Sequence, residues 1–130
     1  MANILILDDS RVVLAYVKRT LSAFGHEVET AEEWYDIRVA LQRFEPDLIM
    51  LDVHLPGLRS GAQLAWHLRK KYPNVKIIFY SGQSPEYLAE QARAARIDGY
   101  LVKGGPPMEF VKNVERFLPP KAVKAVPKIA

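Results

Sequence analysis

The sequence contains no cysteine among its 130 residues. This absence excludes a disulfide framework and thiolate chemistry, and no histidine cluster is present that would suggest a zinc site. No apolar run approaches the ~20 residues that a membrane span requires, and the first residues lack the basic region and cleavage site of a signal peptide. The net charge of only +3 comes from scattered basic residues, which argues against a nucleic-acid surface. We therefore expect a cytoplasmic domain that contacts neither membrane nor nucleic acid directly, and the lack of cysteine is compatible with a reducing compartment.

Five short segments typical of strands, most of them apolar runs, alternate with five amphipathic segments. We predict strands at residues 3–7, 26–30, 47–51, 75–80 and 99–102, and helices at residues 11–24, 31–44, 61–71, 85–95 and 107–118. Strands that read as unbroken apolar runs are buried on both faces, which is typical of a parallel sheet between two layers of helices. The predicted fold is therefore α/β, a doubly wound five-stranded parallel sheet at residues 1–118. Residues 119–130 are predicted to be a linker or disordered tail.

Within this pattern, Ser10 is placed to cap the first helix, and Gly25 occupies the position after it that favours a left-handed residue. In the third helix, Leu64 and Leu68 form the core stripe, so Trp66 falls on the opposite, exposed side. An exposed tryptophan is a candidate contact for a partner protein.

Four of the five predicted strands end in polar or charged residues, namely Asp8 and Asp9, Asp52, Ser81 and Lys103. The carboxyl ends of parallel strands share one edge of the sheet, and ligands bind at that edge. One such residue could be a simple turn or cap residue, but five converging residues indicate a site. Three carboxylates with one ammonium need a cation, and Mg²⁺ with oxygen ligands fits this composition. A carboxylate beside Mg²⁺ can attack phosphorus and form an acyl phosphate.

Four segments in this order and spacing resemble the receiver domains of two-component response regulators, of the chemotaxis-regulator-like kind. They are residues 4–10 (ILILDDS), 47–57 (DLIMLDVHLPG), 77–82 (IIFYSG) and 99–103 (GYLVK). The resemblance covers about residues 3–118 and implies a flavodoxin-like (βα)5 fold. It implies that Asp52 is the phospho-acceptor of a phosphorelay, and that Asp9 directly and Asp8 mostly through water hold Mg²⁺. Asp52 itself would also bind the metal, and the backbone carbonyl of His54 would be the third protein ligand.

The same resemblance assigns roles around the phosphoryl group. Lys103 and Ser81 would bind phosphoryl oxygens, and Tyr100 would be the switch residue that changes rotamer when Ser81 is drawn towards the phosphate. Gly82 would keep the site open to the donor histidine. His54 and Gln83 occupy the two positions that tune the lifetime of the acyl phosphate in this family.

The implied partners are a sensor histidine kinase or histidine phosphotransfer protein as donor, and a downstream protein target that the sequence does not name. The output face, which could also form a homodimer, would consist of residues 85–95, 99–102 and 107–118, with Arg93, Arg96, Phe110 and Lys112 as candidate contacts. Such a domain would catalyse only its own phosphorylation and dephosphorylation, so we do not expect an enzyme acting on other substrates.

The chain departs from the family pattern after Lys103, where the family usually has a proline that often follows a cis bond. Here Gly104 and Gly105 come first, followed by Pro106 and Pro107. A cis bond before a residue other than proline costs about 3 kcal/mol, so we predict a trans bond after Lys103. Since glycine loses the most backbone freedom on ordering, we also expect residues 104–106 to be mobile until phosphate binds. Replacing Gly104 with proline would restrict this loop if its backbone accepts proline.

Two other functions are compatible with the same fold. An aspartyl-phosphate phosphatase of the haloacid dehalogenase type would have a second carboxylate two residues after its nucleophile, where this chain has His54. A flavodoxin-like cofactor carrier would need a loop rich in Ser, Thr and Gly after the first strand, where this chain has Asp8 and Asp9. The site residues, and not the fold, separate these possibilities.

Overall fold

The computed structural model describes residues 1–54 and 61–120. The strands are β1 (Asn3–Leu7), β2 (Glu27–Ala31), β3 (Leu48–Leu51), β4 (Lys76–Ser81) and β5 (Gly99–Val102). The helices are α1 (Arg11–Ser22), α2 (Trp34–Arg43), α3 (Gly61–Lys71), α4 (Pro85–Ala95) and α5 (Pro107–Glu115). All ten predicted elements are present in the predicted order. No helix in the described ranges combines the length and apolarity needed to cross a bilayer.

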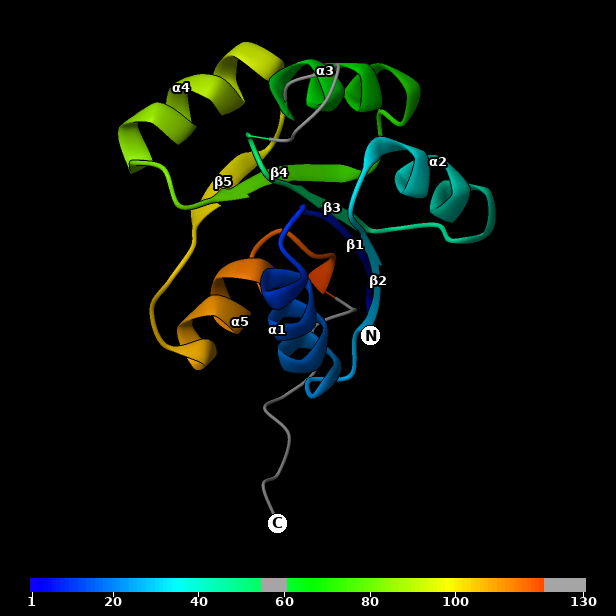
Figure 1. Ribbon diagram of the computed structural model, residues 1–130, viewed down its shortest axis with the longest axis vertical. Helices are drawn as coiled ribbons and strands as arrows, with labels where there is room; N and C mark the ends of the chain where they lie inside the picture. The colour runs from blue at the N-terminus through cyan, green and yellow to red at the C-terminus, as the bar shows by residue number, and fades with distance from the viewer. Residues whose placement is uncertain (55–60, 121–130) are drawn as a thin grey trace.

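The five strands form one parallel sheet in the order β2-β1-β3-β4-β5. Helices α1 and α5 cover one face, and α2, α3 and α4 cover the other (Figure 1). The chain passes from β1 outwards to β2 and then crosses to β3 on the other side of β1. The carboxyl ends of β1 and β3 therefore border the switch point, where open α/β sheets bind their ligands. The predicted doubly wound fold is confirmed.

The core consists of two layers, one on each side of the sheet, because successive residues of a strand point to opposite faces. In β1, Ile4 and Ile6 pack in the layer beneath α1 and α5, and Leu5 and Leu7 pack in the layer beneath α2, α3 and α4. All four are at most 1 % exposed. An uninterrupted apolar strand is what burial on both faces requires.

Local signals place several helix ends. The Ser10 hydroxyl accepts a hydrogen bond from the Val13 N–H (3.3 Å), as the capping prediction requires. Gly25 has a left-handed φ of 88°, although α1 ends at Ser22, two residues before the predicted end. The predicted start of α2 at residue 31 was three residues early, because Glu33 and Asp36 form a reciprocal capping box that fixes the start.

Three strands and the last helix differ from their predicted bounds by one to three residues. Both β2 and β4 begin and end one residue later than predicted, β3 begins one residue later, and α5 ends at Glu115 rather than at residue 118. The register with β1 explains β2, since Ala31 pairs with Leu7 and continues the ladder. Trp66 is 48 % exposed, which confirms its predicted position. The sequence favours a turn at Pro56 and Gly57, and these two residues lie outside the described ranges.

Candidate functional site

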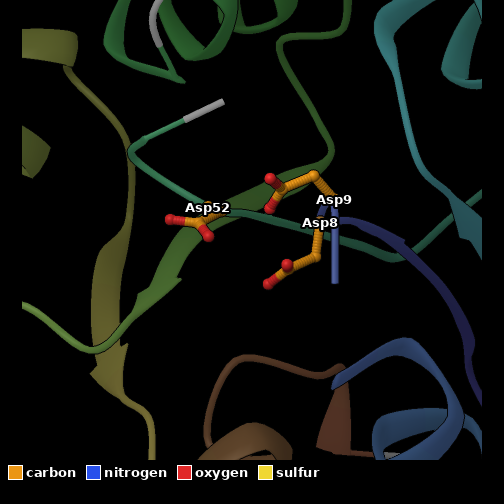
Figure 2. Close-up of side chains that lie close together, drawn as sticks. All are labelled: Asp8, Asp9 and Asp52. Atoms are coloured by element: carbon orange, nitrogen blue, oxygen red, sulfur yellow. The ribbon is translucent and has the colours of Figure 1, made fainter. Parts of the chain in front are cut away.

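Three aspartates meet at the carboxyl ends of β1 and β3. Asp8 and Asp9 directly follow β1, and Asp52 directly follows β3. Each offers a carboxylate oxygen, and these oxygens lie within 4.8 Å of one another. Figure 2 shows the three side chains gathered in one cluster. The sequence prediction that these carboxylates converge is therefore correct in its geometry.

Lys103, which follows β5, reaches the same cluster. Its Nζ lies 2.6 Å from Asp8 Oδ2 and 3.2 Å from Asp52 Oδ2. The backbone N–H of Lys103 donates to the Ser81 carbonyl (2.8 Å), which ties the lysine to the end of β4. The other Asp52 oxygen, Oδ1, accepts the His54 N–H at 3.1 Å. One ammonium thus faces three carboxylates, and the cluster has an excess of negative charge.

Asp8 is the most buried member of the cluster, with only 1 % of the residue exposed. Its Oδ1 accepts the Ser10 N–H (2.9 Å), but its Oδ2 has no hydrogen bond of good geometry within the described residues, despite the close approach of Lys103. Burial raises the pKa of Asp8 more than its interactions with Lys103 and Ser10 lower it. A buried carboxylate oxygen with an incomplete set of partners is suited to bind a cation.

Burial by itself lowers the pKa of Lys103, but its contacts with Asp8 and Asp52 outweigh this effect and the pKa is raised. Lys103 is therefore a fixed positive charge at neutral pH. It can neutralise a carboxylate or bind an anionic oxygen, and it is placed next to Asp52 for either purpose.

The loop after Lys103 contains two left-handed glycines, with φ of 106° at Gly104 and 85° at Gly105. No cis peptide bond occurs in the described part of the chain, so the bond after Lys103 is trans as predicted. Proline requires φ near −65°, so the backbone at Gly104 does not accept proline. Pro107 begins α5 within its first turn, where a missing N–H costs nothing.

Three further predicted residues lie in or directly after β4 and β5. Ser81 is the last residue of β4 and is 3 % exposed, and Tyr100 is half-buried in β5 opposite Phe79. A Cβ added at Gly82 would meet nothing within 4 Å, so the space beside it is open.

One candidate for the output face was wrong. Phe110 is 6 % exposed and packs in the core against Tyr16 and Tyr80, because it lies on the inner face of α5. Arg93, Arg96 and Lys112 are exposed as that face requires.

Sequence reasoning missed Gly61, the first residue of α3. A Cβ at this position would lie 2.3 Å from the Asp52 carbonyl oxygen and 2.7 Å from backbone atoms of Val53. Its N–H also donates to the Val53 carbonyl (2.9 Å), so α3 starts directly against the segment that carries Asp52. In the sequence, the only sign of this close packing was a glycine at the first position of the predicted helix. The ring of His54 stacks on Tyr87 of α4, with 5.9 Å between centroids, and no sequence pattern indicated this contact.

The fold and the cluster together define a class: a doubly wound α/β domain with an acidic pocket and a lysine at its switch point. The response regulator receiver domain model matches residues 4–115. The chain belongs to this family of two-component signalling domains, in which phosphorylation of an aspartate is the general mechanism. Receiver domains generally bind Mg²⁺ and interact with histidine kinases and downstream effectors.

Individual relatives agree with this assignment. The transcriptional regulator NtrC of Azospirillum brasilense is 32% identical over 128 residues, which are 95% of this chain and 26% of NtrC. The structure of chemotaxis response regulator CheY4 of Vibrio cholerae is 30% identical with a TM-score of 0.80, covering 91% of this chain and 99% of CheY4. Response regulator TrrA of Thermotoga maritima, solved in complex with Mg²⁺ and BeF, is 30% identical with a TM-score of 0.78, covering 91% and 100% of the chains. Among the curated relatives, the chain spans about a quarter of NtrC and about half of the respiration regulator ArcA of Escherichia coli.

Proposed function

We propose that Asp52 accepts a phosphoryl group and that Asp8, Asp9 and Asp52 hold Mg²⁺ beside it, with the His54 carbonyl as a further ligand. The observation that supports this most directly is the set of three carboxylates within 4.8 Å of one another, with a single lysine among them. The donors are hard carboxylate oxygens in excess over the single ammonium, and both features fit Mg²⁺. The TrrA complex with Mg²⁺ and BeF shows that a relative of similar fold binds this metal with a phosphoryl mimic.

In this proposal an Asp52 carboxylate oxygen attacks the phosphorus of a phosphorylated histidine in the donor protein. The new P–O bond forms as the P–N bond breaks, and the electron pair of that bond leaves with the imidazole. The metal, when bound, supplies positive charge that offsets the charge on the phosphoryl oxygens. Lys103 moves from Asp52 Oδ2 to a phosphoryl oxygen, and Ser81 donates its hydroxyl to another. Water attack on the acyl phosphate later restores Asp52, so the only reaction catalysed is the domain's own phosphorylation and dephosphorylation.

The signal would leave through the face formed by α4, β5 and α5. Drawing Ser81 towards the phosphoryl group would free space for Tyr100 to repack, which shifts the population of conformations on that face. Tyr87, Val102 and Met108 are exposed there and are between 36% and 42% accessible. A downstream protein, or a second copy of this chain, would bind this face. The functional unit in this proposal is residues 1–118, with residues 119–130 as a linker or tail.

The decisive experiment is phosphorylation by acetyl phosphate with Mg²⁺, followed by intact mass measurement. We expect one added phosphoryl group on the wild type and none on Asp52→Asn or in the presence of a chelator. Asp47→Asn is the matched control, because Asp47 precedes the same strand at its opposite end and bonds to the Asn3 N–H. Equal labelling of Asp52→Asn and wild type would refute the assignment of the acceptor.

The switch requires a separate measurement. Amide chemical shifts should change near Ser81 and Tyr100, and along α4 and α5, when beryllofluoride and Mg²⁺ are added. Shifts that are confined to the loops after β1 and β3 would contradict the switch while leaving the acceptor assignment intact.

A further inference from the structure

A groove of about 290 Å³ lies between α2 and α3, and it shares no residue with the acidic cluster. Its apolar lining comes from Trp34 and Leu41 of α2 and from Leu68 and Tyr72 at the end of α3. These helices cover the sheet face opposite α1 and α5 (Figure 1). Leu68 is fully buried, whereas Trp34, Leu41 and Tyr72 remain partly exposed. The groove is therefore a depression that combines apolar side chains with polar and basic groups, and it can take one or two side chains of another molecule.

The charges around this groove are all of one sign. Its charged or titratable lining residues are Arg38, His67 and Lys71, and none of the lining residues is acidic. Helix α3 contains no aspartate or glutamate at all. Asp36, the acidic residue of α2, accepts backbone N–H groups at the start of its own helix.

Part of this basic character has a structural explanation. Basic residues in the last turn of a helix interact favourably with its dipole, and Lys70 and Lys71 are in such a turn. Arg69 is bound to Asp98 and to three backbone carbonyls, so its guanidinium group already has partners within the domain. Arg38 is in the middle of α2, so the helix dipole does not explain why a basic residue occupies this position. Within the described ranges, neither Arg38 nor Lys71 has a carboxylate partner.

Aromatic rings contact basic residues or histidine on the same two helices. The ring of Trp34 meets His67 edge-on with 6.1 Å between centroids, and Lys70 Nζ lies 4.5 Å from the centre of the Trp66 ring. Trp66 is 48 % exposed on the outer side of α3. Tryptophan, tyrosine and arginine are the residues most often found at the energetic centre of protein interfaces. A floor of apolar residues with a basic rim complements an apolar side chain flanked by carboxylates.

We propose that this groove, the α2–α3 groove, binds an acidic peptide segment of a partner protein. The chain's own residues 121–130 have the wrong charge for this role, because they contain three lysines and no acidic residue. A nucleic acid would need a basic stripe that follows its backbone, and this site is a short pocket with basic residues at its rim. The proposed contact is separate from the acidic cluster and from the α4-β5-α5 face, with which the groove shares no residue.

The intrinsic fluorescence of the protein reports in part on this groove, since Trp34, one of the two tryptophans of the sequence, lines it. The probe is a synthetic ten-residue peptide with two leucines among glutamates, titrated up to about 1 mM, the weak end of protein recognition. We expect saturable binding, with amide shifts concentrated on α2 and α3. Replacing the glutamates with glutamine, or the leucines with serine, should weaken binding at least fivefold.

The test variant is Arg38→Gln combined with Lys71→Gln. Exposed ion pairs contribute modestly to binding, so loss of the two should weaken binding about tenfold. The matched control is Lys18→Gln with Lys112→Gln, which removes the same charge from exposed positions on α1 and α5. Circular dichroism verifies that both variants fold.

Three outcomes would overturn the proposal: no saturable binding of the acidic peptide, equal weakening in the test and control variants, or amide shifts outside α2 and α3. A single-stranded DNA oligomer that bound the groove more tightly than the peptide would also overturn it, in favour of a nucleic-acid ligand.

Discussion

Lys103 lies where it competes with a metal for the carboxylates, so its removal gives a specific test of the site. Its Nζ is 2.6 Å from Asp8 Oδ2 and 3.2 Å from Asp52 Oδ2. The carboxylate oxygens of the cluster lie within 4.8 Å of one another. A divalent cation among them would therefore be about 5 Å from the ammonium, and the two would repel by about 1.7 kcal/mol even at the dielectric constant of water. We predict that Lys103→Met binds Mg²⁺ more tightly than the wild type.

The size of the effect follows from this repulsion. A difference of 1.7 kcal/mol corresponds to roughly a fifteenfold change in a binding constant. Because a lysine side chain can swing partly aside, we expect an increase of about tenfold in Mg²⁺ affinity. Without metal the variant should be less stable by about 2 kcal/mol, because Asp8 is 1 % exposed and would lose its ion pair. Phosphorylation should nevertheless fall, since Lys103 is assigned to the phosphoryl oxygens.

Isothermal titration calorimetry measures the affinity, and urea unfolding with and without Mg²⁺ measures the stability. Calorimetry is preferable to fluorescence because neither tryptophan belongs to the acidic cluster. Lys112→Met, on the exposed side of α5, is the control and should change neither quantity. If Lys103→Met bound Mg²⁺ no more tightly than the wild type, the metal site could not be the cluster that Lys103 occupies.

Three further changes test other parts of the structure. Gly61→Ala forces a Cβ against the Asp52 carbonyl, so it should lower the free energy of unfolding in urea by about 1–3 kcal/mol and slow phosphorylation. Gly82→Ala is the control and should leave the stability unchanged, because the space around Gly82 is open. Equal effects of the two substitutions would contradict the close packing of α3. Gly104→Pro should destabilise the protein, since φ is 106° there, and a stabilised variant in the same assay would show that the loop is built differently. Burial raises the pKa of Tyr80 from 10.0 to about 12, so the folded state holds this proton more tightly, and the stabilisation is complete below pH 10 and lost as the pH rises through 12. This loss of about 2–3 kcal/mol in the free energy of unfolding should be absent in Tyr80→Phe. If the wild type and Tyr80→Phe lost stability equally at alkaline pH, the raised pKa of Tyr80 would be contradicted.

The sequence by itself determined the ten elements and their order. Apolar runs, helical periodicity, and residues such as Ser10 and Gly25 are local signals, and each acts over a few neighbouring positions. Boundaries were less certain, as at α2, because the capping box of Glu33 and Asp36 competes with a continuous apolar pattern. The helix propensities of individual residues do not determine at which of these positions the helix starts.

The convergence of Asp8, Asp9, Asp52 and Lys103 could also be predicted before any coordinates were known. Parallel topology carries the carboxyl end of every strand to one edge, so residues far apart in sequence share a site once the strands are assigned. The sequence alone therefore indicated that these side chains converge, and their distances agree with that prediction.

Only the tertiary structure decided how individual side chains meet. Buried His26 accepts the Ala2 N–H and contacts Glu115, 89 positions further along the chain, and no periodicity indicates that pairing. The fit of Gly61 against Asp52 and the α2–α3 groove have the same origin. Periodicity states which face of a helix is buried, but the distance between two helices depends on how all their side chains pack together on the sheet.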